Sequence, residues 1–224
     1  IADGHHRYRT VLAYREEMKK KFHSIPPDAS FNSVSMYLSN LRDRSLSILP
    51  IHRVIPESSL VSFHLENFIQ GLKKIFNIEV YKEEGNFWSR FNELNNIQTA
   101  IGLYCQDMLK EFYILILKNT NWARNLPPFL KKMDVMVLNR LIFKKILGFS
   151  EAQMNQEGFI KYVTDAQEAI TMVKEGKGRM VFLLNPIKPQ QLKEVVFSSH
   201  LMPRKSTYFH PKLLTGLVIN SLEL

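Results

Sequence analysis

Short apolar runs alternate along this chain with segments whose apolar residues recur every three or four positions, and this alternation constrains the fold more than any other feature. The clearest runs cover residues 100–104 and 112–117, on either side of a polar turn with Gln106 and Asp107. They predict two strands. The longer run, 112–117, falls far short of the roughly 20 apolar residues that cross a bilayer, so we expect no membrane span.

The remaining elements follow the same two patterns. Strands are predicted at 34–38, 46–55, 78–81 and 180–184, with Pro50 marking an edge or a bulge. Helices are predicted at 7–22, 60–72 (capped by Ser58 and Ser59), 86–94, 135–147, 166–175 (capped by Asp165) and 189–196. The sequence therefore predicts an α+β fold, with a mixed sheet and interleaved helices.

Composition sets limits on the class of protein. Hydrophobic residues make up 45% of the chain and charged residues 23%, which excludes a wholly disordered chain. The net charge of +9 is compatible with nucleic acid, acidic lipid or phosphate-bearing ligands and does not choose among them. The single cysteine, Cys105, excludes an internal disulfide and a cysteine-based zinc site, and it favours a reducing cytoplasm.

The densest polar group is the segment Asp3-Gly4-His5-His6-Arg7, at the expected junction between a strand end and a helix start. Free backbone N–H groups and the positive end of the helix dipole favour an anion there. Gly4 permits close backbone approach, and Arg7 can bind a phosphate through two N–H groups. The same residues also fit a polar helix cap with exposed histidines. No further ligands stand at a metal-binding spacing, so we expect no metal site.

Two other polar groups are candidates for binding an anion or substrate. His52 and Arg53 end the strand that begins at residue 46, and a plain surface pair explains them equally well. The second group lies in residues 202–212 and comprises Lys205, Ser206, Thr207 and Lys212. A basic loop packed by aromatic residues is its alternative explanation. Cys105 is expected to be buried, and Asp134 is expected to cap the helix that follows it.

Five segments stand out in order along the chain. They are Ile-Ala-Asp-Gly-His-His-Arg-Tyr (1–8), Leu-Pro-Ile-His-Arg (49–53), Met-Asp-Val-Met-Val-Leu (133–138) with Ile-Leu-Gly (146–148), Phe-Leu-Leu-Asn-Pro (182–186) and Met-Pro-Arg-Lys-Ser-Thr-Tyr-Phe-His-Pro-Lys-Leu-Leu-Thr-Gly-Leu-Val (202–218). Together they resemble the domain of unknown function 1015 family, a set of mostly bacterial and archaeal cytoplasmic proteins. The first segment also resembles the phosphate-binding box of the ParB/sulfiredoxin-like fold, which includes free serine kinases.

The resemblance implies a cytoplasmic, nucleotide-dependent kinase that uses ATP or ADP with Mg²⁺ and favours free L-serine as the acceptor. Residues 3–7 would bind the nucleotide phosphates. Substrate or anion contacts would come from His52, Arg53, Lys205, Ser206, Thr207 and Lys212. No membrane and no nucleic-acid partner is expected. A non-catalytic nucleotide-binding or DNA-associated module remains the alternative, and so does a scaffold whose histidines cap a helix.

The resemblance also implies a domain organisation. Residues 1–56 would be the remainder of a ParB/sulfiredoxin-like nucleotide-binding region. Residues 57–224 would form an α/β C-terminal region whose tail returns to the site. Because the chain begins with Ile1 and the polar box follows at once, we expect an N-terminally truncated, poorly active fragment. We identify no general base in the sequence, and in the related serine kinases a carboxylate upstream of the box would serve.

Overall fold

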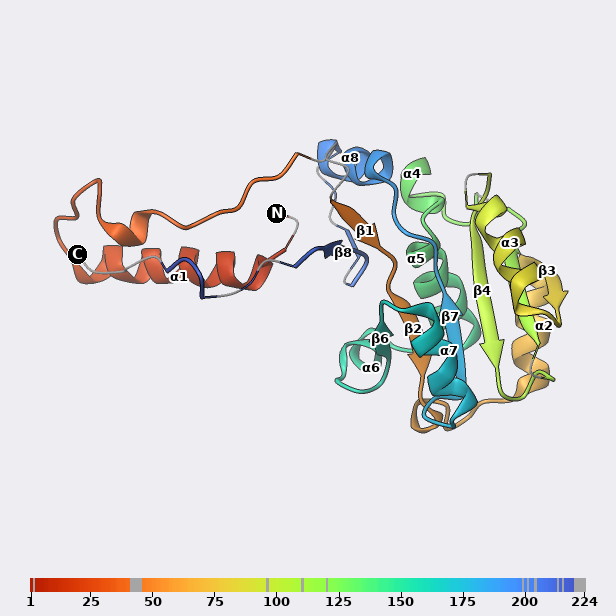
Figure 1. The fold of residues 1–224 in the computed structure, drawn as a ribbon. Helices are drawn as coiled ribbons and strands as arrows, with labels where there is room; N and C mark the ends of the chain where they lie inside the picture. The colour runs from red at the N-terminus through yellow and green to blue at the C-terminus, as the bar shows by residue number, and fades with distance from the viewer. Residues whose placement is uncertain are drawn as a thin grey trace. The chain divides into compact units, whose positions relative to one another are not determined.

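The computed structural model describes residues 1, 3–40, 46–95, 97–109, 111–119, 121–198, 200, 202–203, 205–212, 214 and 216–219. The chain divides into two compact units, which we describe separately (Figure 1). The first contains residues 1–47 and 209–224, and the second contains residues 48–208. This division differs from the expected boundary at residues 56–57, because the strand that ends at Ile55 belongs to the larger unit.

A six-stranded sheet forms the centre of the second unit. Its strand order is β3-β5-β4-β7-β2-β6, and each neighbouring pair is antiparallel. These strands are β2 (His52–Ile55), β3 (Phe76–Tyr81), β4 (Ala100–Cys105), β5 (Phe112–Leu117), β6 (Lys161–Val163) and β7 (Met180–Leu183). Two further strands, β1 (Ser47–Leu49) and β8 (Tyr208–His210), form a separate two-stranded sheet.

Helices cover both faces of the six-stranded sheet, as Figure 1 shows. On one face lie α2 (Leu65–Ile75), α5 (Asp134–Val137) and the π-helix η3 (Leu138–Ile146), which continues α5. On the other lie α3 (Glu84–Leu94) and α7 (Ala166–Lys174). Every residue of β4 and β5 is buried, because each side chain meets a helical layer whichever face it points to.

Four short elements complete the second unit. The 3₁₀ helix η2 (Glu57–Ser59) follows β2, and α4 (Pro128–Lys131) precedes α5. The helix α6 (Glu151–Asn155) begins with a capping box, in which Ser150 and Gln153 bond each other's backbone N–H. The helix α8 (Pro189–Phe197) follows β7 and starts at a proline, whose missing N–H costs nothing at that position.

The first unit is built on one long helix, α1 (His5–Lys21), and the 3₁₀ helix η1 (Ser30–Asn32). No residue of α1 is fully buried. The segment after it folds back because Arg15 Nε donates to Asn32 Oδ1 at 3.2 Å. The rings of Tyr14 and Phe31 also meet edge to face, with centroids 6.4 Å apart. Phe31 is therefore the buried anchor of this unit.

Most predicted elements of the second unit are confirmed. The strands at 100–104 and 112–117 pair as an antiparallel hairpin. The helix predicted at 135–147 is present as α5 and η3, and Gly148 follows it with φ 72°. Asp165 caps α7 by accepting the Glu168 N–H at 2.7 Å. The combination of α-helices and β-strands is confirmed as well, but the predicted mixed sheet is wrong, because all neighbouring strands of the six-stranded sheet are antiparallel.

Three predictions about local structure are wrong. Residues 34–38 form no strand, and Met36, Tyr37 and Leu38 are exposed; an alternating pattern makes a strand only when a partner supplies hydrogen bonds. The strand predicted at 46–55 is divided into β1 and β2 at Pro50 and Ile51. The helix expected after Ser58 and Ser59 begins only at Leu65, because the Ser59 hydroxyl donates to the Phe159 carbonyl instead of capping.

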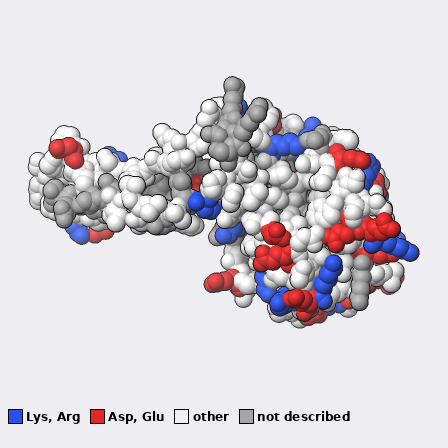
Figure 2. Space-filling view, in the orientation of Figure 1, with Lys and Arg blue, Asp and Glu red and all other residues white. Residues whose placement is uncertain are grey.

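The net positive charge is not gathered into one field on the face of the larger unit that Figure 2 shows. Acidic and basic side chains are interspersed there. Several of them form ion pairs, such as Arg179 with Asp107 and Arg90 with Glu79. Among the residues that the structure describes, none of the helices combines the length and apolar character required to span a bilayer.

Gly102 in β4 provides a test of packing between sheet and helix. A Cβ atom at this position would lie 2.8 Å from Phe87 Cζ and 3.0 Å from Leu183 Cβ. We expect Gly102→Ala to lower the free energy of unfolding by about 1–3 kcal/mol, because the buried Phe87 ring must shift. Urea unfolding measures the change. The matched control is Gly85→Ala, whose added methyl meets nothing within 4 Å; equal stability of the two variants would contradict the prediction.

Candidate functional site

The polar segment of residues 3–7 lies at the start of α1 in the first unit. The helix begins at His5, and Gly4 before it takes a left-handed conformation with φ 80°. The backbone N–H groups of the first turn have no intrahelical acceptor, and no side chain caps them. His5, His6 and Arg7 are exposed. The predicted helix start is confirmed, whereas the predicted strand end before it is wrong, because residues 1, 3 and 4 belong to no strand.

Two cations are held close to this helix start. An added Cβ at Gly4 would lie 3.3 Å from Arg7 Nε, so the guanidinium lies directly over the backbone of the turn. Lys212 Nζ donates to Asp3 Oδ2 at 2.9 Å, and the Gly4 N–H donates to Asp3 Oδ1 at 2.9 Å. The hydrogen bond from Lys212 is the main cause that lowers the pKa of Asp3. The basic tail thus returns to the polar segment within this unit.

His52 and Arg53 lie on β2 in the second unit, and both are buried. His52 Nδ1 accepts the Leu184 N–H at 3.1 Å, and burial lowers the pKa of His52 to about 4, so the ring is neutral at physiological pH. Arg53 donates to the carbonyls of Ile51 and Lys205, the latter at 2.7 Å. Burial lowers the pKa of Arg53 to about 10. The interpretation of His52 and Arg53 as an exposed surface pair is therefore wrong.

The structure brings Arg53 together with part of the tail. Lys205 is exposed and takes a left-handed φ of 55°, with its carbonyl held by Arg53. Ser206 is buried and donates to the Pro203 carbonyl, and Thr207 is half-buried. The predicted binding residues therefore fall into two groups. Residues 3–7 and Lys212 belong to the first unit, whereas His52, Arg53, Lys205, Ser206 and Thr207 belong to the second. Their binding roles remain predictions.

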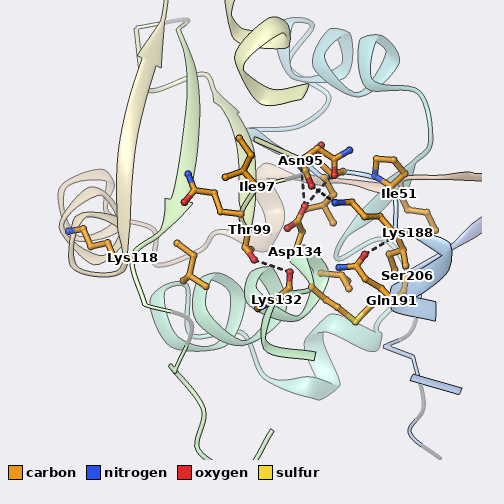
Figure 3. A pocket seen from close by; sticks show the side chains of 18 residues that line it. Ile51, Asn95, Ile97, Thr99, Lys118, Lys132, Asp134, Lys188, Gln191 and Ser206 are labelled. Carbon is orange, nitrogen blue, oxygen red and sulfur yellow. Dashed lines mark hydrogen bonds between the residues drawn. The ribbon is translucent and has the colours of Figure 1, made fainter. Parts of the chain in front are cut away.

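A cavity of about 550 Å³ in the second unit contains a set of polar residues that the sequence analysis missed. Figure 3 shows the side chains that line it. They come from the turn after α3, the end of β5, the start of α5 and the segment between β7 and α8. Its polar lining includes Asp134, Asn185, Lys188, Gln191, Lys118 and Lys132.

Asp134 is the carboxylate of this cavity, and its predicted role as a helix cap is wrong. Met133 occupies the cap position, and Asp134 is the first residue of α5. Its Oδ2 accepts the Asn185 backbone N–H at 3.4 Å and Asn185 Nδ2 at 3.2 Å. Burial raises the pKa of Asp134 to about 7, against the smaller opposing effects of Asn185, Lys188 and the Ala100 backbone. A carboxyl group in this state changes its charge near neutral pH.

Lys188 supplies the positive charge beside this carboxylate. Its Nζ donates to the Asn95 carbonyl at 2.6 Å, and its backbone N–H donates to Gln191 Oε1 at 3.0 Å. The side chain is half-buried and points toward Asp134 in Figure 3. With the other residues that the structure describes, neither Asp134 nor Lys188 forms an ion pair.

Sequence patterns gave only an indirect signal for this cavity. Four of the five segments that carry the family resemblance contribute to its lining: Ile51 from 49–53, Asp134 from 133–138, Asn185 from 182–186 and Ser206 from 202–218. Their meeting point depends on the sheet order, which no local pattern contains. Within the described part of the chain, no group of three or more His, Cys, Asp or Glu side chains is placed to hold a metal ion.

Comparison with known proteins relates most of the chain to one family. The family model described as "Protein of unknown function (DUF1015)" matches residues 1–185. Among solved structures, a conserved hypothetical protein from Pyrococcus furiosus is similar at 14% identity with a TM-score of 0.40. The match covers 76% of this chain and 59% of that protein, so this chain spans less than two thirds of its length. No curated protein matches.

Proposed function

The chain belongs to the DUF1015 family of proteins of unknown function, and on this basis we propose that it takes part in nucleotide-dependent phosphoryl transfer to a small hydroxylated metabolite, with free L-serine the favoured acceptor. The proposal includes a ParB/sulfiredoxin-like origin for the phosphate-binding segment and a cytoplasmic location. The observation that carries it is the exposed start of α1, where uncapped N–H groups, Gly4 and the guanidinium of Arg7 converge.

This arrangement suits a phosphate group for electrostatic reasons. Phosphoryl transfer depends on positioning and on neutralising the charge of the phosphate oxygens. The N–H groups of the first turn and the dipole of a 17-residue helix favour an anion, and Arg7 adds a full positive charge. Gly4 matters because a side chain there would contact the Arg7 guanidinium and adopt a strained backbone conformation.

ATP or ADP fits these residues through its phosphates. Mg²⁺ is proposed to arrive bound to the nucleotide, because such ions keep several waters and need only one or two carboxylates from the protein. The chemistry that the nucleotide supplies is the phosphoryl group itself. Asp3 is the carboxylate of the segment, and its bond to Lys212 keeps it ionised, as the lowered pKa of Asp3 indicates.

Arg7→Ala is the direct test of the segment. We expect the variant to bind ATP and ADP about tenfold more weakly, because a charge-assisted hydrogen bond to phosphate contributes about 1.5–3 kcal/mol. Calorimetric titration measures the affinity, and mass spectrometry measures O-phosphoserine formed from L-serine. Arg9→Ala is the matched control, since Arg9 is exposed on the same helix. Equal nucleotide affinity of the two variants, or the absence of saturable nucleotide binding, would overturn the proposal.

A DNA-associated module is the second candidate, because α1 is a largely exposed helix with several basic residues. They are Arg7, Arg9, Arg15, Lys19, Lys20 and Lys21, against Glu16 and Glu17. Binding of this kind weakens steeply with salt, since phosphate contacts release counterions. Fluorescence anisotropy with labelled duplex DNA at two salt concentrations tests this candidate. Salt-steep DNA binding without nucleotide binding would favour it over the kinase proposal.

A further inference from the structure

We propose that the cavity between Asp134 and Lys188 binds a small amino-carboxylate zwitterion, with the Asp134 carboxylate on the ligand ammonium and the Lys188 ammonium on the ligand carboxylate. This proposal deepens the proposed function by giving its acceptor a site. It rests on that function only for the choice of L-serine as the probe.

The enclosure of the two charges is the first argument. Asp134 and Lys188 are both only partly exposed, and both line a cavity of about 550 Å³, which lies in the range typical of small-ligand sites. A charge that leaves water is normally compensated by an opposite charge or by several short hydrogen bonds. Asp134 has two long bonds from Asn185, at 3.2 and 3.4 Å, and a weaker interaction with the Ala100 backbone, but no ion pair with a described residue.

The fixed placement of the two charges is the second argument. Asn185 Nδ2 donates both to Asp134 and, at 3.4 Å, to the Ala100 carbonyl, which holds the pair at the start of β4. The bond to the Asn95 carbonyl holds Lys188 Nζ on the other side. An ammonium retains further N–H donors after one such bond, so Lys188 can still bind a carboxylate. Figure 3 shows both side chains at the same end of the cavity, whereas Lys118 lies at the opposite end.

The signs of these charges select the class of ligand. A simple anion would meet the Asp134 carboxylate beside Lys188, and a simple cation would meet the Lys188 ammonium beside Asp134. A ligand with an ammonium and a carboxylate a few bonds apart satisfies both. The remaining cavity, lined by Gln191 and by apolar residues such as Met133 and Ile187, leaves room for a short side chain.

The arrangement also makes binding depend on pH. The other charged groups of the cavity lining are Lys188 before α8, which acts on Asp134 directly, and Lys132 before α5 and Lys118 after β5. Among these groups, Asp134 is the one whose raised pKa brings a change of charge near neutral pH. Because burial raises the pKa of Asp134 to about 7, an ammonium ligand binds better as the pH rises from 5.5 to 8.

The test uses the full chain, without nucleotide, and four ligands that differ by single groups. L-serine and L-alanine carry both charges, 3-hydroxypropionate lacks the ammonium of serine, and ethanolamine lacks its carboxylate. Calorimetry or ligand-observed NMR measures each affinity at pH 5.5 and pH 8. We expect both amino acids to bind at least about tenfold more tightly than either singly charged analogue at pH 8, and L-serine to weaken at pH 5.5.

Three variants assign the charges. Asp134→Asn is expected to weaken L-serine about tenfold or more, to leave 3-hydroxypropionate unweakened and to abolish the pH dependence. Lys188→Met is expected to weaken L-serine and 3-hydroxypropionate but not ethanolamine. Lys145→Gln, on the exposed side of η3, is the surface control and should bind as the wild type does.

Two results would overturn the inference. One is no saturable binding of any amino acid to the folded wild-type protein. The other is an Asp134→Asn variant, folded by circular dichroism, that loses L-serine and 3-hydroxypropionate to the same degree. This outcome can be distinguished from that of the proposed function. Amino-acid binding without saturable nucleotide binding supports the cavity site and contradicts the kinase proposal. Nucleotide binding at α1 without amino-acid binding supports the proposed function and contradicts the cavity site.

Discussion

Replacing Asp134 by Asn is expected to remove a pH-dependent destabilisation of the fold. Burial raises the pKa of Asp134 to about 7 in the folded protein, from its ordinary value of 3.8. A raised carboxyl pKa means that the folded state binds the proton more tightly than the unfolded state. Protonated Asp134 therefore contributes to the free energy of unfolding. This contribution is fully present below about pH 4 and is lost as the pH rises through 7.

The expected size of this effect is large for a single carboxyl group. Between pH 4 and pH 8, the wild-type protein should lose about 2–4 kcal/mol of unfolding free energy that Asp134→Asn retains. Urea unfolding at one-unit pH intervals measures the difference. Glu157→Gln removes an equal charge from an exposed position and should run parallel to the wild type. A constant difference between Asp134→Asn and the wild type across this range would contradict the expectation.

Arg53→Ala is expected to lower the free energy of unfolding by about 3–5 kcal/mol. The side chain is among the largest that are fully buried, so its removal leaves a cavity next to β2. It also leaves the carbonyls of Ile51 and Lys205 without the donors they have now. Loss of the second bond should release the segment that carries Ser206 into the cavity lining.

Hydrogen exchange separates the two contributions. Arg53→Met fills most of the space but donates no hydrogen bond, so we expect partial recovery of stability together with fast exchange at residues 205–208. Arg140→Ala, at an exposed position, should change stability by no more than about 0.5 kcal/mol. If Arg53→Ala unfolds within 1 kcal/mol of the wild type, the guanidinium does not anchor this segment.

The fold could be predicted from the sequence wherever local chemistry and tertiary packing agree. The hairpin of β4 and β5, the helix that Gly148 ends and the Asp165 cap all follow from local patterns in the sequence. The alternating pattern at 34–38 gave a wrong prediction, because no neighbouring strand pairs with these residues in the described part of the chain. The serine at position 59 misled because its hydroxyl bonds Phe159, one hundred residues further along.

The residues of the candidate site show the same difference between local signals, which could be predicted, and long-range contacts, which could not. The start of α1 could be predicted, because glycine before a helical pattern is a local signal. Asp134 could not, since a carboxylate at a helix start satisfies the rules for a cap, and Asn185 lies 51 residues away in sequence. The burial of His52 and Arg53 could not be predicted from the sequence either, because it follows from the position of β2 between β6 and β7.

The order of strands in the sheet also governs when the larger unit can fold. Strands β3, β4 and β5 come from residues 76–117 and can pair soon after they leave the ribosome. The earlier strand β2 must wait, because Arg53 pairs with Tyr162 and Phe182. Such distant pairing slows folding. In the sheet, β7 lies between β4 and β2. A nascent chain that ends before residue 180 therefore leaves β4 and β2 each with an unpaired edge, where strands of other chains can pair and cause aggregation.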